Sequence, residues 1–296
     1  MGASVLITLR EGLEISLVLA ILATSLVRAG RADALRPMWV GAGAAMVVCV
    51  VGGVAFHLAV GEFEGKSEQL IEGVLAASAA IVLTWMIFWM RRNARGMSSE
   101  LRAKLDAATT PTAVALIAFV ATAREGFEMV LFLLGAETGS SSGAAVVVGG
   151  LIGLAIAAAL GVAVYRRGQH LNLATFFKVT GVLLIFFAAG LVGKAFHEFR
   201  ELFGFQSGWL ISPPVWEITS GPLAEGTLFD FLNGMFGWSS NPEPIRAIAY
   251  LAYLVPVLWL FLAGTRTAST GRPPGPKAAE GAADVHASSA TATTAP

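Results

Sequence analysis

The sequence has little charge for its length and almost no cysteine. Only 14% of its 296 residues are Asp, Glu, Lys or Arg, whereas soluble domains carry about 25%. Cys49 is the only cysteine, which excludes an intramolecular disulfide and a metal site built from several thiolates. The net charge is zero, so composition gives no reason to expect a nucleic-acid partner. With 55% hydrophobic residues, the chain is predicted to be an integral membrane protein surrounded by lipid.

Apolar runs long enough to cross a bilayer occur seven times in the chain. A helix needs about 20 mainly apolar residues to span the hydrocarbon core. The predicted spans are 4–27, 37–60, 69–91, 112–136, 144–165, 174–198 and 246–264. We therefore expect an all-α integral membrane protein, with a seven-helix transmembrane domain over 1–265 as a multi-pass protein of the plasma membrane.

The distribution of Lys and Arg predicts the orientation of these spans. The loops after the first, third and fifth spans are basic, and so is the region after the last span. Basic loops stay in the cytoplasm, so the N-terminus is expected outside and the C-terminus inside. Residues 200–245 then form an outer loop, in which 223–236 is predicted as a short amphipathic helix. Residues 266–296, rich in Ala, Thr, Ser, Gly and Pro, are expected to form a disordered cytoplasmic tail.

The chain contains an internal repeat. The string Arg10–Glu14 recurs as Arg124–Glu128 at a shift of 114 residues, and the next two spans align with the fifth and sixth at a shift of 108. Each repeat holds three spans, an odd number, so the second repeat is expected to be inverted relative to the first. We expect repeats over about 1–92 and 111–200, plus a seventh helix at 246–264. Inverted repeats with a polar site at their interface are typical of transporters.

Each repeated string, Arg-Glu-Gly-x-Glu, places three charges inside an apolar span. A charge at the bilayer centre costs on the order of 2.5–3.5 kcal/mol, so six would cost roughly 15–20 kcal/mol unless they were paired or solvated. Glutamates three residues apart lie on one face of a helix. Antiparallel first and fourth spans would therefore bring four carboxylates around one point, and these are Glu11, Glu14, Glu125 and Glu128.

Four converging carboxylates predict a site for a hard cation, because such cations prefer oxygen ligands. Without a cation, repulsion requires some of the carboxylates to be protonated. Arg10 and Arg124 are expected to balance part of the charge, for example by a bidentate bond to a glutamate. The alternative is that Arg and Glu pair within each helix and only fix packing. A second copy in a symmetric position makes that alternative the weaker one.

Polar side chains near the predicted outer ends of the third and sixth spans are candidates for the entrance or relay of cations. They are Glu68, Glu72, His197, Glu198 and Glu201. The alternatives are a solvated loop around Glu68 and an interfacial cluster around His197. Met86 and Met90, at the other end of the third span, are interpreted as packing residues rather than as part of a metal path.

The two strings, in the first and fourth of seven spans, resemble those of the high-affinity iron permeases, which include a fungal permease that works with a multicopper oxidase and its bacterial relatives. The resemblance covers roughly 1–264. Further matching segments are Glu68-x-x-x-Glu72-Gly73, Met86-x-x-Trp89-Met90, Phe196-His197-Glu198-x-x-Glu201 and Gly237-Trp238. The resemblance implies that the four motif glutamates bind iron, as Fe2+ or Fe3+, during transport. It also implies an extracytoplasmic redox partner: a cupredoxin-like or haem-peroxidase component, or an oxidase.

Together with this resemblance, the sequence predicts an iron importer with no tightly bound cofactor, in which iron is the cargo. We find no nucleophile–base pair or cofactor motif, so an enzyme is not expected. One alternative is a transporter of another divalent cation, such as manganese or lead. The other is a non-transporting membrane sensor that binds iron, although the C-terminal tail looks too short for an output domain.

Overall fold

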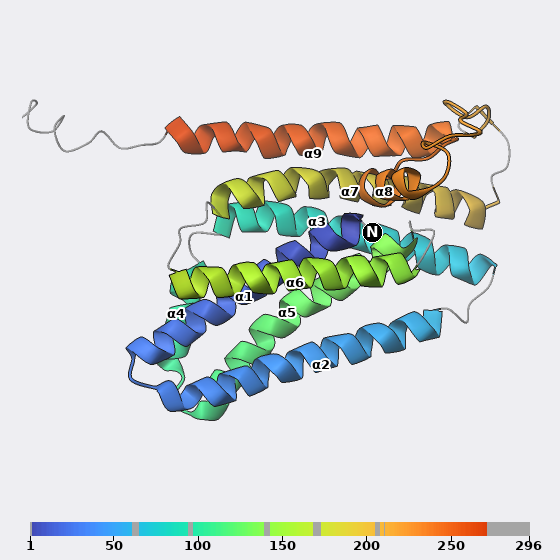
Figure 1. The fold of residues 1–296 in the computed structure, drawn as a ribbon. Helices are drawn as coiled ribbons and strands as arrows, with labels where there is room; N and C mark the ends of the chain where they lie inside the picture. Colours follow the sequence, from blue (N-terminus) through green and yellow to red (C-terminus); the bar gives the residue numbers. More distant parts are fainter. Residues whose placement is uncertain are drawn as a thin grey trace, which may run out of the picture. The chain divides into compact units, whose positions relative to one another are not determined.

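The computed structural model describes residues 2–60, 65–93, 97–138, 143–167, 173–204, 208–209 and 211–270, and every regular element among them is a helix (Figure 1). The chain divides into two units, Met1–Val257 and Leu258–Pro296. All contacts discussed below lie within the first unit.

Each of the seven predicted spans falls within one long helix of the structure. These helices are α1 (Gly2–Arg28), α2 (Leu35–Val60), α3 (Lys66–Asn93), α5 (Pro111–Thr138), α6 (Gly143–Arg167), α7 (Leu173–Leu202) and α9 (Pro244–Thr270). Five stretches are long and apolar enough to cross a membrane: Ala32–Ala59, Lys66–Arg92, Gly143–Ala163, Thr175–Leu202 and Pro244–Ala263. They lie in α2, α3, α6, α7 and α9, and the first begins in the short 3-10 helix η1 (Ala32–Ala34) before α2. The protein is therefore a multi-pass, all-helical membrane protein. The two other long helices, α1 and α5, carry the charged motifs.

Large apolar side chains on the outside of the helices fit this environment. Val50, Val51 and Ile81 are each more than half exposed in the isolated chain. Such a surface is costly in water but not in hydrocarbon. In a membrane these side chains therefore face lipid.

Two short helices and the start of α5 show how local sequence sets the element bounds. The helix α4 (Met97–Ala107) was not predicted, because it is short and polar, yet its buried Leu101 and Leu105 pack in one cluster with α1 residues. The helix α8 (Thr227–Phe236) ends where predicted but starts later than 223, because turns precede it and Gly226 adopts a φ of 92°. The start of α5 at Pro111 agrees with the preference of proline for the first helical turn.

The predicted tail is only partly described. α9 continues to Thr270, so the first residues of the segment 266–296 are helical. The remaining residues, 271–296, lie outside the described part of the chain.

The helices pack in a pattern that is the same for both halves. α1 packs along α6 and α5 packs along α2, while α3 lies against α7 and α1 against α5. Exchanging α1 with α5, α2 with α6 and α3 with α7 leaves this set of pairs unchanged. In Figure 1, α1 and α5 both run obliquely to α3, α6 and α7.

Glycines in the two motifs make equivalent close contacts. A Cβ atom added at Gly12 would lie 2.8 Å from the Cβ of Ala157 on α6. One added at Gly126 would lie 2.7 Å from the Sγ of Cys49 on α2. Gly126 lies 114 residues after Gly12, and Ala157 lies 108 residues after Cys49, so these contacts follow the two shifts of the sequence repeat. Small residues at such positions let helix backbones approach closely.

A second pair of contacts obeys the same shifts. A Cβ atom added at Gly161 would lie 2.7 Å from the Cβ of Ser16, and one added at Gly53 would lie 3.1 Å from Val130 Cγ1. Ser16 and Val130 are 114 residues apart, and Gly53 and Gly161 are 108 apart. The internal similarity therefore extends from sequence to the contacts between helices.

Candidate metal centre

The four motif glutamates are buried where α1 and α5 meet. The exposed fractions of Glu11, Glu14, Glu125 and Glu128 are 0%, 3%, 5% and 5%. The i, i+3 spacing places both glutamates of each helix on one face. Close packing of Gly12 on α6 and of the equivalent glycine of α5 on α2 covers the opposite sides of the two helices.

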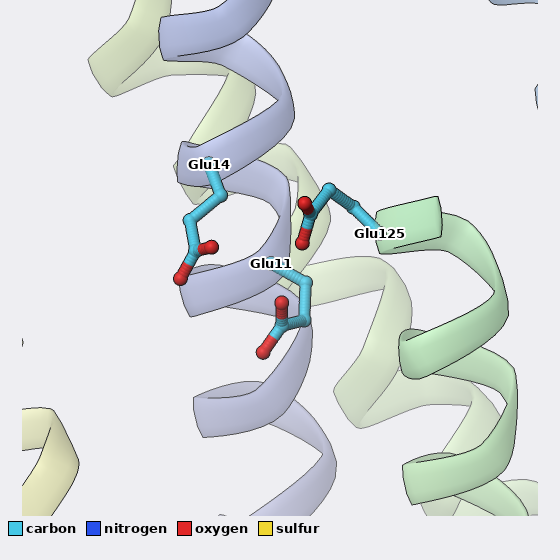
Figure 2. Close-up of side chains that lie close together, drawn as sticks. All are labelled: Glu11, Glu14 and Glu125. Atoms are coloured by element: carbon cyan, nitrogen blue, oxygen red, sulfur yellow. The ribbon is translucent and has the colours of Figure 1, made fainter. Parts of the chain in front are cut away.

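Three of these carboxylates converge. One oxygen from each of Glu11, Glu14 and Glu125 lies within 4.8 Å of the other two, and this is the one group of three or more acidic, His or Cys side chains at such spacing among the described residues. Figure 2 shows Glu125 reaching from α5 toward α1, where its carboxylate lies beside those of Glu11 and Glu14. Glu128 is outside this group of three, and its Oε1 lies 3.2 Å from Nε of Arg124 on the preceding turn.

The arginine of the first motif bridges its two glutamates. Arg10 Nη1 lies 3.3 Å from Glu11 Oε1, and Nη2 lies 3.3 Å from Glu14 Oε1. The guanidinium therefore contributes one nitrogen to each carboxylate and does not form a bidentate bond to either. Arg124 acts similarly through Nε, which lies 3.8 Å from Glu125 in addition to its contact with Glu128.

The arginines compensate the glutamates only in part. Four carboxylates against two guanidinium groups leave a formal charge of minus two when all are ionised. The Oε2 atoms of Glu11, Glu125 and Glu128 are buried and accept no hydrogen bond in the structure. Buried acceptors without a partner are unfavourable, and a bound cation would satisfy them. The donor set is oxygen only, which suits a hard or borderline cation.

Both arginines also contact α3. Arg10 donates from Nη1 to the Sδ of Met86 and from Nη2 to the Sδ of Met90, each at 2.8 Å. The Cζ of Arg124 lies 4.3 Å from the ring centroid of Trp89, a cation–π contact. One end of α3 therefore contacts the charged residues of both motifs.

Two of the candidate entrance residues, Glu72 and Glu198, belong to a second charged network, which is centred on Lys194. Lys194 Nζ on α7 lies 2.8 Å from Glu72 on α3 and 3.7 Å from Glu198 one turn along. Lys194 thus pairs with both carboxylates, offsets one of their two negative charges, and joins α3 to α7. Glu68, in the first turn of α3, is exposed.

The remaining candidates, His197 and Glu201, lie at the junction of α7 and α9. His197 contacts Glu201 at 3.6 Å and Glu243 at 3.3 Å, and Arg200 contacts the same two glutamates at 3.0 and 2.9 Å. Glu201 also accepts a hydrogen bond from Gln69 of α3. The acids at this junction, Glu201 and Glu243, are therefore engaged by basic side chains.

Comparison with known proteins identifies the family. The model of the iron permease FTR1 family matches residues 1–269. The chain belongs to the iron permease FTR1 family. The ferrous iron permease EfeU of Yersinia pestis is 35% identical over 267 residues, which cover 88% of this chain and 93% of the relative. EfeU of Escherichia coli O6:H1 is 35% identical over 270 residues, or 90% and 96% of the two chains. No solved structure matches the chain.

The resemblance to iron permeases is thereby confirmed, while two features of this family member were missed in the sequence. The sequence did not predict a role for Lys194, because a single lysine near the end of a predicted membrane helix is usually an interfacial residue. Met86 and Met90 were interpreted as packing residues. Their spacing with Trp89, at i, i+3 and i+4, does indicate one helix face, but nothing in the sequence indicates that arginines contact it.

Proposed function

We propose that the protein imports iron across the plasma membrane and that iron binds between α1 and α5. The observation that carries this proposal is the buried group of three carboxylates, Glu11, Glu14 and Glu125, in a chain of the iron permease family. Glu128 lies beside the group and is proposed as a fourth ligand that iron recruits from Arg124. The relatives are named ferrous iron permeases, so Fe2+ is the form to test first.

The charge of the cluster supports a cation as cargo. A divalent ion would offset the formal charge of minus two that the arginines leave. Iron here is the transported ion, and we propose no tightly bound cofactor and no enzymatic reaction. Arg10 and Arg124 are proposed to lower the repulsion between the glutamates when the site is empty.

We further propose that α1 and α5 cross the membrane, which gives seven spans with the N-terminus outside and the C-terminus in the cytoplasm. The repeat-related contacts of Gly12 with Ala157 and of Gly126 with Cys49 support two inverted repeats around the cluster. In such an arrangement the site lies at the repeat interface, near the middle of the membrane.

The second charged network, formed by Lys194 with Glu72 and Glu198, is proposed as the entrance for cations. Glu72 and Glu198 share Lys194, so a cation that arrives there would compete with the lysine and would be held only briefly. Glu68, His197 and Glu201 are proposed to collect or relay cations at the same side. An extracytoplasmic redox partner, either a cupredoxin-like or haem-peroxidase component or an oxidase, is proposed to supply iron there.

Iron flux into proteoliposomes that contain only this protein tests the proposal. We expect uptake of Fe2+ from the outside, and loss of uptake in Glu14→Gln with normal insertion into the vesicles. Uptake close to wild type in that variant would contradict the glutamate site. Competition by Mn2+ or Pb2+ measures selectivity, and faster flux of either ion than of iron would contradict iron as the substrate.

A further inference from the structure

One face of α3 contacts both motif arginines, although the arginines come from different helices. Met86 and Met90 are buried, with exposed fractions of 0% and 5%, and each accepts an N–H from the guanidinium of Arg10. Trp89, on the same face, lies under Arg124. Nothing in the proposed binding of iron by glutamates requires this arrangement.

The two sulfur atoms determine how Arg10 meets the carboxylates. Nη1 is shared between Met86 and Glu11, and Nη2 between Met90 and Glu14. The planar fork of the guanidinium is therefore divided between two glutamates. A fork free to rotate would favour a bidentate bond with a single carboxylate, which is the stronger geometry.

Thioether sulfur is suited to this role because it is a weak acceptor. It is polarizable enough to hold an N–H in a buried place, but it carries no charge that would neutralise the arginine. A carboxylate in its place would remove Arg10 from the cluster. An aliphatic side chain would leave the arginine with the glutamates as its nearest acceptors.

Trp89 holds the second arginine by its ring face. Its position is supported by Trp85, whose ring is stacked on it at 6.0 Å and 26°. A guanidinium over an aromatic face keeps its N–H groups directed outward in the plane of the group. Nε of Arg124 contacts Glu125 and Glu128, at 3.8 and 3.2 Å.

We propose that Met86, Trp89 and Met90 are positioning residues that hold Arg10 and Arg124 at the edge of the glutamate cluster, so that the arginines compensate its charge without occupying the oxygens that bind iron. The inference rests on the proposed glutamate site. It makes α3, which contributes no ligand, a determinant of iron affinity.

The test replaces both sulfurs with carbon at similar volume, as Met86→Leu/Met90→Leu, since Leu and Met exchange at small cost in cores. Fe2+ binding to the detergent-solubilised full chain and Fe2+ uptake in proteoliposomes are measured together. We expect the Kd and the apparent KM to rise about tenfold, the equivalent of one charge-assisted hydrogen bond that now competes with iron. The maximal rate should change much less. A purely structural defect would instead lower the amount of active protein and leave KM unchanged.

Met129→Leu is the matched control. Met129 lies next to Glu128 in the chain but packs against the cluster of Ile15, Leu19 and Ala42. The same change of side chain there should leave both Kd and KM unchanged. A tenfold rise in this variant would overturn the assignment to the α3 sulfurs.

A double-mutant cycle with Arg10→Lys tests whether the sulfurs act through the arginine. Lysine has no fork and cannot form a bidentate bond, so the effect of the two Leu substitutions on Kd should vanish in the Arg10→Lys background. An equal effect in both backgrounds would overturn the inference, because independent sites add.

Trp89 gives a second, separate readout. Trp89→Phe keeps a ring face and should restore the iron affinity that Trp89→Leu loses. If both variants bind iron like wild type, Trp89 has no positioning role.

Loss of iron binding in Glu125→Gln, together with unchanged binding in all α3 variants, would contradict this inference while leaving the glutamate site intact. Normal iron binding in Glu125→Gln would contradict the site itself.

Discussion

Glu125→Gln is the most direct test of the carboxylate cluster. Glu125 is the ligand candidate that α5 contributes to the group of three, whereas Glu11 and Glu14 both come from α1. Glutamine keeps the shape and one oxygen but removes the charge. The variant therefore asks whether negative charge from the second motif is needed for iron to bind.

The size of the effect follows from the spacing of the carboxylate oxygens, which lie within 4.8 Å of one another. Two unit charges at about 4 Å interact by about 4 kcal/mol at an effective dielectric constant of about 20. The attraction between one carboxylate and a divalent ion is twice as large, and the cost of removing water from the ion and the carboxylate offsets part of that attraction. If only about 1.4 kcal/mol remains, the affinity falls tenfold. We therefore expect the Kd for Fe2+ to rise at least about tenfold, and uptake at low iron to fall accordingly.

The assay is equilibrium binding of Fe2+ to the purified protein, followed by uptake in proteoliposomes. Glu100→Gln provides the control, because Glu100 is exposed on α4 and pairs with Lys104 at 2.8 Å. The hydrogen bond from Lys104 lowers the pKa of Glu100, so this substitution also removes a full charge at neutral pH. A Kd for Glu125→Gln within twofold of wild type would refute the reasoning, as would an equal loss in the control.

Two further predictions concern stability. Gly126→Ala places a methyl group against Cys49 Sγ, so it should destabilise the protein by about 1–3 kcal/mol, as measured by thermal unfolding in detergent. Adding Cys49→Ala should recover part of the lost stability, and no recovery would contradict the close contact. Lys194→Gln leaves Glu72 and Glu198 without their shared cation. Because these side chains are partly exposed, the loss of stability should be roughly 1–3 kcal/mol, which is less than for a fully buried ion pair. Adding Glu72→Gln should restore much of that loss, and an unchanged melting temperature in the single variant would rule out the network as a support.

Much of this architecture is encoded in short-range patterns of the sequence. Apolar runs located the long helices, because a membrane helix must be continuously apolar over a fixed length. The repeat of the motif indicated which two helices meet, because both carry charges that lipid does not solvate. The sequence also predicted that Glu125 would lie with Glu11 and Glu14, and these three carboxylates do converge.

The contacts that the sequence did not predict are long-range and chemically unusual. Thioether acceptors for Arg10 are invisible to pattern reasoning, since methionine in an apolar helix is normally a packing residue. Lys194 was missed because its partner Glu72 lies on another helix far away in sequence. The helix α4 was missed because a short polar helix resembles a loop until its partner surface is known.

The packing of α1 on α6 and of α5 on α2 has a consequence for biogenesis. Each motif helix makes its most extensive contacts with the second helix of the other half, α6 for α1 and α2 for α5. α1 is synthesised before α5 and α6, and the helices α2, α3 and α4 lie between α1 and α5 in the described part of the chain. Until α5 is made, the charged residues Arg10, Glu11 and Glu14 of α1 cannot contact the second motif. We therefore expect α1 to remain with the insertion machinery, shielded from lipid, until the second half of the chain arrives.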